Sequence, residues 1–450
     1  MRKALLIAAV AVVAATGAIV GVIVSSGGDG SSAGPGTSAA SGSTGSTSTG
    51  PGGTSGRTTT GSTSTGLTGD QLVPTTTASI PPAPRPGSPR LKTFLVGTVD
   101  DALAQRNPAS ARAQVDLSHR AGFDAVVISA AWQRGRTAPA SGTLRGIRNA
   151  GAAAKRDHMR FFLVSWHGLA RETPHDGAQR QQFADFTAAL VKALPGASGV
   201  IVGNEPNMNT FWLPQFGPGG RDVAAAGYED LLARTYDAVK AASPGTRVIG
   251  VALSPRGADR PHGIRPTHSP TEFILDLGRN YRNSGRRRPL MDAFAIHPYM
   301  LRSRISPARA HTRTTQITIG DYPKLVTLLD EAFRGTAQRG RTLPILYTEF
   351  GVQTVVPRNK LAAYQPGTTP DAEDAVAAAR QAAYYREALA LAYCQPTVKG
   401  LFVFHTFDEP GLNGWQSGLY YANRTPKPSL KGFRRAVADL RDGKLTNCGR

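Results

Sequence analysis

Two glutamates in this sequence follow short apolar runs, and their positions suggest that they act as a pair. Glu205 ends the apolar run in VIVGNEPN (residues 200–207), and Glu349 ends the run in PILYTEFGV (residues 344–352). A carboxylate at the end of an apolar strand is expensive to desolvate unless it has a partner or a use. Two facing carboxylates can cleave a glycosidic bond, one as the proton donor and the other as the nucleophile.

The elements around these glutamates follow a repeated strand–helix pattern. Segments with apolar residues at helical spacing separate the apolar runs, and each run is continuous, as in parallel strands buried on both faces. The runs lie at residues 94–100, 123–132, 160–168, 199–207, 247–255, 292–300, 344–352 and 400–409. Eight such repeats predict an α/β fold, the (β/α)8 TIM barrel. The alternative is an open doubly wound sheet, but no Gly-rich phosphate turn follows the first run.

In a barrel of this kind the active site forms at the carboxyl ends of the strands. Polar and aromatic residues should therefore follow the apolar runs. The residues found there are Trp132, Trp166, His167, Asn204, Glu205, His297, Tyr299, Glu349 and His405. We expect Glu205, after the fourth run, and Glu349, after the seventh, to point into one mouth. Trp132, Trp166 and the loop residue Trp415 are candidates for sugar contacts, because an aromatic face stacks on the apolar face of a pyranose.

Two motifs resemble those of clan A glycoside hydrolases. The Asn-Glu-Pro at 204–206 is similar to their acid/base motif, and the Thr-Glu-Phe-Gly at 348–351 is similar to their nucleophile motif. The likeness covers residues 91–440 and is greatest to family 5 cellulases and family 39-type β-glycosidases. It implies that Glu205 is the acid/base and Glu349 the nucleophile of a retaining reaction that needs no cofactor and no metal.

The same resemblance implies roles for the neighbouring residues. Asn204 would hydrogen-bond the sugar 2-hydroxyl, and Tyr299, in the His-Pro-Tyr that begins at His297, would orient the nucleophile. Ser165-Trp166-His167 is similar to the Asp-Trp-His that ends the third strand in family 5, with Ser in place of Asp.

The sequence also departs from family 5 in two places. The second run lacks the arginine that these enzymes carry there, and the eighth run ends in His405 and Phe407 instead of a sugar-stacking tryptophan. We expect Trp415, on the following loop, to take over the stacking and His405 to contact substrate. These departures leave the sugar, its linkage and the endo or exo mode of action open.

Two segments precede the catalytic domain. Residues 1–24 contain an uncharged apolar run after Arg2 and Lys3, which predicts a secretory signal peptide or a single membrane anchor. Residues 25–90 consist mainly of Gly, Ser, Thr and Pro, which predicts a disordered linker. Residues 91–450 then form the barrel. Either reading of residues 1–24 places this domain outside the cytoplasm, secreted or held at the membrane, and we expect a monomer.

Charge and cysteine content narrow the function classes. The net charge is +21, from 52 basic and 31 acidic residues. The basic residues are spread along the chain, and the one tight run, 286–288, has no interleaved aromatics, so nucleic acid is not an expected partner. Cys394 and Cys448 predict one disulfide in an exported protein. Neither cysteine has the spacing of a metal ligand.

These observations favour a glycosidase that hydrolyses a β-linked polysaccharide or oligosaccharide, with carbohydrate as its partner. The alternative is a cell-surface carbohydrate-binding pseudoenzyme with the same barrel. A third hypothesis, a basic domain that binds an anionic polymer, requires clustered basic residues. The presence of both glutamates favours the enzyme.

Overall fold

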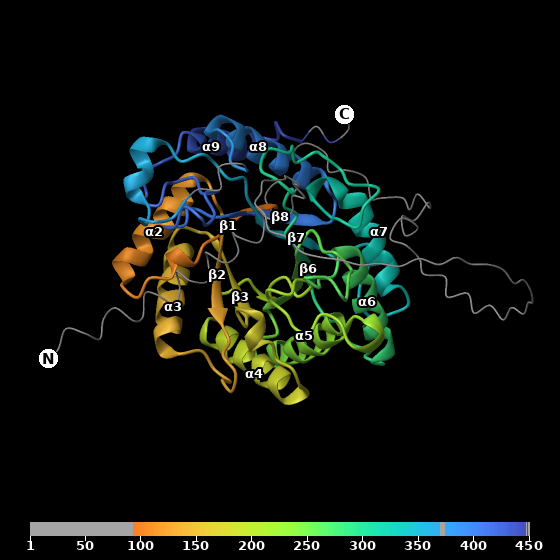
Figure 1. Cartoon of the computed structure of the whole chain (residues 1–450). Coiled ribbons are helices and arrows are strands. Elements are labelled where there is room, and N and C mark those ends of the chain that lie inside the picture. The colour runs from red at the N-terminus through yellow and green to blue at the C-terminus, as the bar shows by residue number, and fades with distance from the viewer. Residues whose placement is uncertain (1–92, 370–373, 447, 449–450) are drawn as a thin grey trace, which may run out of the picture.

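A computed structural model describes residues 93–369, 374–446 and 448 of this chain, and these residues form a closed barrel of eight parallel strands (Figure 1). The strands are β1 (Leu95–Val99), β2 (Ala125–Ala131), β3 (Arg160–Trp166), β4 (Gly199–Val202), β5 (Arg247–Leu253), β6 (Ala293–Ile296), β7 (Ile345–Phe350) and β8 (Val398–Phe404). They pair in sequence order, and β8 closes the barrel against β1. The predicted (β/α)8 TIM barrel is therefore confirmed.

Helices surround the barrel, as Figure 1 shows. They are α2 (Pro108–Ala121), α3 (Ser141–Arg156), α4 (Gly177–Ala193), α5 (Val223–Ala242), α6 (Pro270–Asn283), α7 (Tyr322–Phe333), α8 (Ala378–Cys394) and α9 (Ser429–Arg441). Short 3-10 helices lie in the connections: η2 (Asp101–Leu103), η3 (Ala170–Glu172), η4 (Pro218–Gly220), η5 (Ile319–Asp321) and η6 (Arg358–Ala363). None of the helices among the described residues has the length and apolar character needed to cross a membrane.

Local sequence signals explain where the helices begin and end. α2 begins at Pro108 after the N-cap Asn107, whose side chain accepts hydrogen bonds from two backbone N–H groups. It ends at Ala121, and the C-cap Gly122 has φ of 103°, in the left-handed region. The side chains of Asp176 and Asp222 cap α4 and α5 in the same way. These caps set the lengths of the connections and therefore the positions of the loops at the barrel mouth.

The core has two layers. Inside the barrel, small side chains alternate with large ones, among them Val127, Phe162, Ile249 and Phe402. A Cβ atom at Gly97 would lie 2.1 Å from the Phe402 ring, so glycine is required there. A larger cluster fills the space between the strands and the helices.

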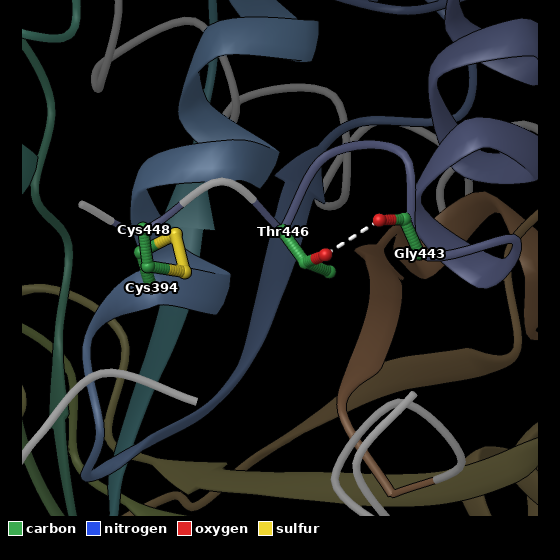
Figure 2. Close-up of a disulfide and its surroundings, with 4 residues drawn as sticks. All are labelled: Cys394, Gly443, Thr446 and Cys448. Carbon is green, nitrogen blue, oxygen red and sulfur yellow. Dashed lines mark hydrogen bonds between the residues drawn. A yellow bond between two sulfur atoms is a disulfide. The ribbon is translucent and has the colours of Figure 1, made fainter. Parts of the chain in front are cut away.

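A disulfide joins Cys394, the last residue of α8, to Cys448 in the C-terminal tail, with an S–S distance of 2.07 Å (Figure 2). This is the pairing that the two cysteines predict. The bridge lies near the start of β8, at the end of the barrel opposite to the carboxyl ends of the strands. The predicted signal or anchor (residues 1–24) and the predicted linker (25–90) lie outside the described residues.

Several strands end earlier than the apolar runs predict. β4 ends at Val202 because Gly203 adopts φ of 80°, and β6 ends at Ile296, just before His297-Pro298. The candidate residues after these strands therefore lie in loops at the mouth rather than within the barrel wall.

Candidate active site at the barrel mouth

The loop after β4 holds Glu205 through its backbone. Glu205 has φ of 40°, in the left-handed region that side-chain-bearing residues seldom adopt. Its N–H donates to the carbonyl of Ala252 on β5 (2.9 Å), and its carbonyl accepts from the N–H of Met208 (2.9 Å). The direction of the carboxylate is therefore set by contacts to the neighbouring strand.

Asn207 connects the same loop to the loop after β5. The residue is fully buried, and its Nδ2 group donates to three backbone carbonyls, one of them that of Ser254 (3.3 Å). Its Oδ1 atom accepts from the N–H of Ser254 (3.0 Å). Asn207 thus acts as a cross-link two residues beyond Glu205.

The structure brings Glu205 and Glu349 together around His297. The Nδ1 atom of His297 lies 3.0 Å from Oε1 of Glu205 and 3.6 Å from Oε2 of Glu349. The two oxygens cannot be farther apart than the sum of these two distances. That upper bound lies at the lower edge of the range of about 6.5–9.5 Å found in inverting glycosidases. Any bend at Nδ1 brings the carboxylates closer, toward the ~5–5.5 Å of retaining enzymes.

Tyr299 forms a hydrogen bond with the proposed nucleophile. Its hydroxyl donates a hydrogen bond to Oε2 of Glu349 (3.0 Å). Burial and the charge of Glu349 raise the pKa of Tyr299 well above its usual range, so the phenol keeps its proton and remains a donor. A hydrogen bond of this kind stabilises the anionic form of Glu349.

The charged side chains of the site shift the pKa values of Glu349 and His297. Burial raises the pKa of the Glu349 carboxyl, and the charge of Glu205 raises it further, while His297, His405 and the Tyr299 hydroxyl act in the opposite direction. Burial alone would lower the pKa of His297, but the charges of Glu349 and Glu205 raise it overall.

The glutamates line a pocket with an empty volume of about 660 Å³ at the mouth. Loops after β4, β5, β6, β7 and β8 form its wall. The lining residues are Glu205, Met208, Thr210, Phe211, Ser254, Pro255, Arg256, Tyr299, Met300, Ser303, Glu349, Gly351, Asp374 and Trp415. This set includes four of the residues that the sequence predicts for the site, namely Glu205, Tyr299, Glu349 and Trp415.

Trp415 lines the pocket beside β8, whereas His405 is not a lining residue, and its contact with substrate stays a prediction. The Nδ1 group of His405 donates to the carbonyl of Val99 (2.8 Å), and its Nε2 atom lies 3.4 Å from a carboxylate oxygen of Glu409. Burial disfavours the charged ring, but Glu409 and Asp100 raise the pKa of His405 to about 9. The Trp415 ring is nearly buried and lies 5.0 Å from the Tyr299 ring between centroids.

Trp132 does not lie where the sequence led us to expect. Its side chain is 1% exposed, its Nε1 group donates to the carbonyl of Arg136 (2.7 Å), and its ring packs edge-on against Phe183 of α4. The expectation that Trp132 contacts substrate is therefore corrected, because no face of the ring is open. Its role is to fill the space between β2 and α4.

The other predicted residues differ in their access to the pocket. His167 is buried, packs edge-on against Trp212 and is not a lining residue of the pocket. Burial lowers the pKa of its imidazole to about 4, so the ring is neutral near pH 7. Trp166 is half-buried beside Phe211, a lining residue. Asn204 is half-buried next to Glu205 in the chain. Substrate contacts by Asn204, Trp166 and His167 stay predictions.

Arg256 and Asp374 are lining residues that the sequence did not single out. Asp374 accepts hydrogen bonds from the backbone N–H (2.6 Å) and the hydroxyl (3.4 Å) of Ser303. Both residues lie in long loops, where the sequence carries no periodic signal. The one available signal for Arg256 is its position three residues after the end of β5. Within the described part of the chain, no group of His, Cys, Asp and Glu side chains is arranged to hold a metal ion.

No family model matches the sequence, and no curated protein matches it either. Among solved structures, the chain is similar to GH5_18 from Streptomyces cattleya in complex with GlcNAc, with 18% identity over 77% of this chain and 80% of the other and a TM-score of 0.50. It is also similar to a GH5_18 from Bifidobacterium longum subsp. infantis (15% identity, 77% and 79% coverage, TM-score 0.50). A third match is the AHE enzyme from Alicyclobacillus herbarius (16%, 81% and 99%, 0.50). At these identities the likeness establishes the shared barrel fold.

Proposed function

We propose that this protein is a retaining glycoside hydrolase that cleaves O-glycosidic bonds in a β-linked oligosaccharide or polysaccharide. The observation that carries the proposal is the contact of Glu205 and Glu349 with one imidazole nitrogen of His297, at 3.0 and 3.6 Å, in a pocket at the barrel mouth. The shared barrel with GH5_18, which was solved with GlcNAc, supports a carbohydrate as the ligand.

The proposed reaction is a double displacement. Glu205 donates its proton to the glycosidic oxygen while the Glu349 carboxylate attacks the anomeric carbon from the opposite face. The C–O bond to the leaving group breaks, and a glycosyl ester forms on Glu349. Glu205, now a carboxylate, removes a proton from a water molecule that attacks the anomeric carbon and releases Glu349. Tyr299 supports the ionised form of Glu349 at the start and at the end of the cycle.

We further propose that the protein works outside the cytoplasm. The disulfide between Cys394 and Cys448 supports this location, because such bonds persist in oxidising compartments. The predicted export signal or anchor at residues 1–24 points to the same place. Labelling of the protein in intact and in lysed cells with a membrane-impermeant reagent distinguishes an extracytoplasmic from a cytoplasmic location.

The first test is hydrolysis of a panel of aryl β-glycosides by the full chain, including β-glucoside, β-mannoside and β-N-acetylglucosaminide. We expect turnover of at least one sugar by the parent. Replacing Glu205 by Gln should lower kcat by about 10²–10⁴-fold, the usual contribution of a general acid, and replacing Glu349 should lower it at least as much. Glu331→Gln on the exposed face of α7 is the matched control and should keep full activity.

Azide rescue of alanine variants distinguishes the acid/base role of Glu205 from the nucleophile role of Glu349. In Glu205→Ala, azide should attack the glycosyl ester and give a glycosyl azide with retained configuration. In Glu349→Ala, azide should take the place of the nucleophile and give the inverted product. The anomeric configuration is read by proton NMR. Sugar binding by the parent without any turnover would instead favour the carbohydrate-binding pseudoenzyme.

A further inference from the structure

Arg256 contributes a positive charge to the pocket wall beside Glu205. It follows β5, and its backbone carbonyl accepts a hydrogen bond from the buried side chain of Asn207 (3.3 Å), which fixes its position. Burial lowers the pKa of its guanidinium, and the charges of Glu205 and Asp374 work against this effect. No residue in the described ranges forms an ion pair with the guanidinium. A half-buried cation of this kind is costly unless a countercharge arrives.

The acidic groups of the wall act on Arg256 through their charges, but neither Glu205 nor Asp374 forms an ion pair with it. Asp374 directs both carboxylate oxygens toward Ser303. Under the proposed function, Glu205 must carry a proton before it can act as an acid, and in that state it is neutral. In the reactive form of the pocket the guanidinium therefore loses the charge of Glu205, and it lies beside the group that protonates the leaving oxygen without an ion-pair partner among the described residues.

The lining of the pocket also includes apolar side chains from three of its loops. Met208 and Phe211 come from the loop after β4, Pro255 precedes Arg256 in the chain, and Met300 follows Tyr299. Phe211, Pro255 and Met300 are buried. Such a wall packs against an apolar body, and its low dielectric strengthens any ion pair that forms within it.

We propose that the leaving-group side of this pocket binds a leaving group with an apolar body and a carboxylate, and that Arg256 selects it. The chemical class is the glycoside of an aryl or alkyl hydroxy acid. This inference rests on the proposed function, because Glu205 defines the leaving-group side. The guanidinium fork matches a carboxylate with two parallel hydrogen bonds, a geometry that lysine cannot reproduce.

The test compares two nearly isosteric substrates, 4-carboxyphenyl and 4-carbamoylphenyl β-glycosides of the sugar that the panel identifies. We expect kcat/KM of the parent to favour the carboxylate. Arg256→Met should lower the ratio of the two kcat/KM values by about 10- to 100-fold, the effect of losing a charge-assisted hydrogen bond. Arg256→Lys should lower it less. Arg260→Met removes an exposed arginine from the same loop and should leave the ratio unchanged.

A binding measurement keeps this inference separate from the glycosidase proposal. Calorimetry with 4-hydroxybenzoate and 4-hydroxybenzamide should show tighter binding of the acid by the parent and loss of that preference in Arg256→Met. Hydrolysis of the carbamoyl glycoside without any preference for the carboxylate would overturn the role of Arg256 and leave the glycosidase intact. No hydrolysis of either glycoside, with selective binding of the acid, would overturn the glycosidase and keep the anion site. If Arg256→Met does not fold, the preference of the parent and its reduction in Arg256→Lys decide the question.

Discussion

At the scale of single residues, Tyr299 tunes the ionisation of the proposed nucleophile. Its hydroxyl donates to Glu349, and this contact lowers the pKa of a carboxyl that burial raises. Glu349 must be ionised to attack, so activity should fall as the pH drops through its pKa. The acid limb of the pH profile therefore reports on the Tyr299 contact.

Tyr299→Phe should move the acid limb of kcat/KM to higher pH. A hydrogen bond to a charged group contributes roughly 1.5–3 kcal/mol, and losing this one raises the pKa of Glu349 because the anion loses a donor. The measurement is a pH–rate profile from pH 4 to 9. Tyr281→Phe, which removes a hydroxyl on α6 that donates to the carbonyl of Arg288, is the control and should leave the limb in place. An unshifted limb in Tyr299→Phe would show that the contact does not govern ionisation.

At the scale of elements, strand alternation explains which candidates reach the site. Trp132 has the same parity as Val126, Ile128 and Ala130, which face the helices, whereas Val127 faces the barrel interior. Because side chains alternate between the two faces of a strand, this parity predicts that Trp132 faces the helices and is buried. His297 shares the parity of Ala293 and Ala295, which face inward.

Glu349 shows where parity fails. Ile345, Tyr347 and Phe350 all pack in the layer between strands and helices, so the alternation is interrupted between residues 347 and 350. The pairing of β7 with β8 shifts register at the same place. This irregularity turns Glu349 toward the mouth. The barrel could be predicted because continuous apolar runs mark parallel strands, but a shift in register depends on a neighbouring strand and leaves no mark on the run itself.

The loop cross-link made by Asn207 gives a prediction at the same scale. Asn207→Ala leaves a buried N–H and several carbonyls without their partner, at about 1–3 kcal/mol for each unsatisfied group. We expect a loss of roughly 2–4 kcal/mol in the free energy of unfolding and a fall of more than tenfold in kcat/KM, because Glu205 loses its support. Urea unfolding and steady-state kinetics measure the two effects.

Asn149→Ala is the matched control for Asn207→Ala. Asn149, on α3, also donates to two backbone carbonyls, but these lie between η2 and α2. Its loss should lower stability while leaving kcat/KM close to that of the parent. Equal losses of activity in both variants would mean that general destabilisation, and not the loop after β4, controls the site.

At the scale of the whole molecule, the disulfide should affect stability without affecting catalysis. Cys394 and Cys448 are 54 residues apart and close a loop that contains β8 and α9. Cys394→Ala/Cys448→Ala should lower the free energy of unfolding by about 2–4 kcal/mol. Activity at 25 °C should not change, since the bridge lies at the opposite end of the barrel from the glutamates. Loss of activity in a variant that stays folded would contradict this separation.

The direction of β1 has a consequence for how the protein presents itself. All eight strands run the same way, so the chain enters the barrel at Thr93 on the end opposite to the mouth. The residues before Thr93 therefore join the barrel at the amino ends of its strands. This end is one strand length, or roughly 17 Å, away from the glutamates. A tether on the N-terminal side would therefore attach at the end away from the pocket and leave the mouth uncovered.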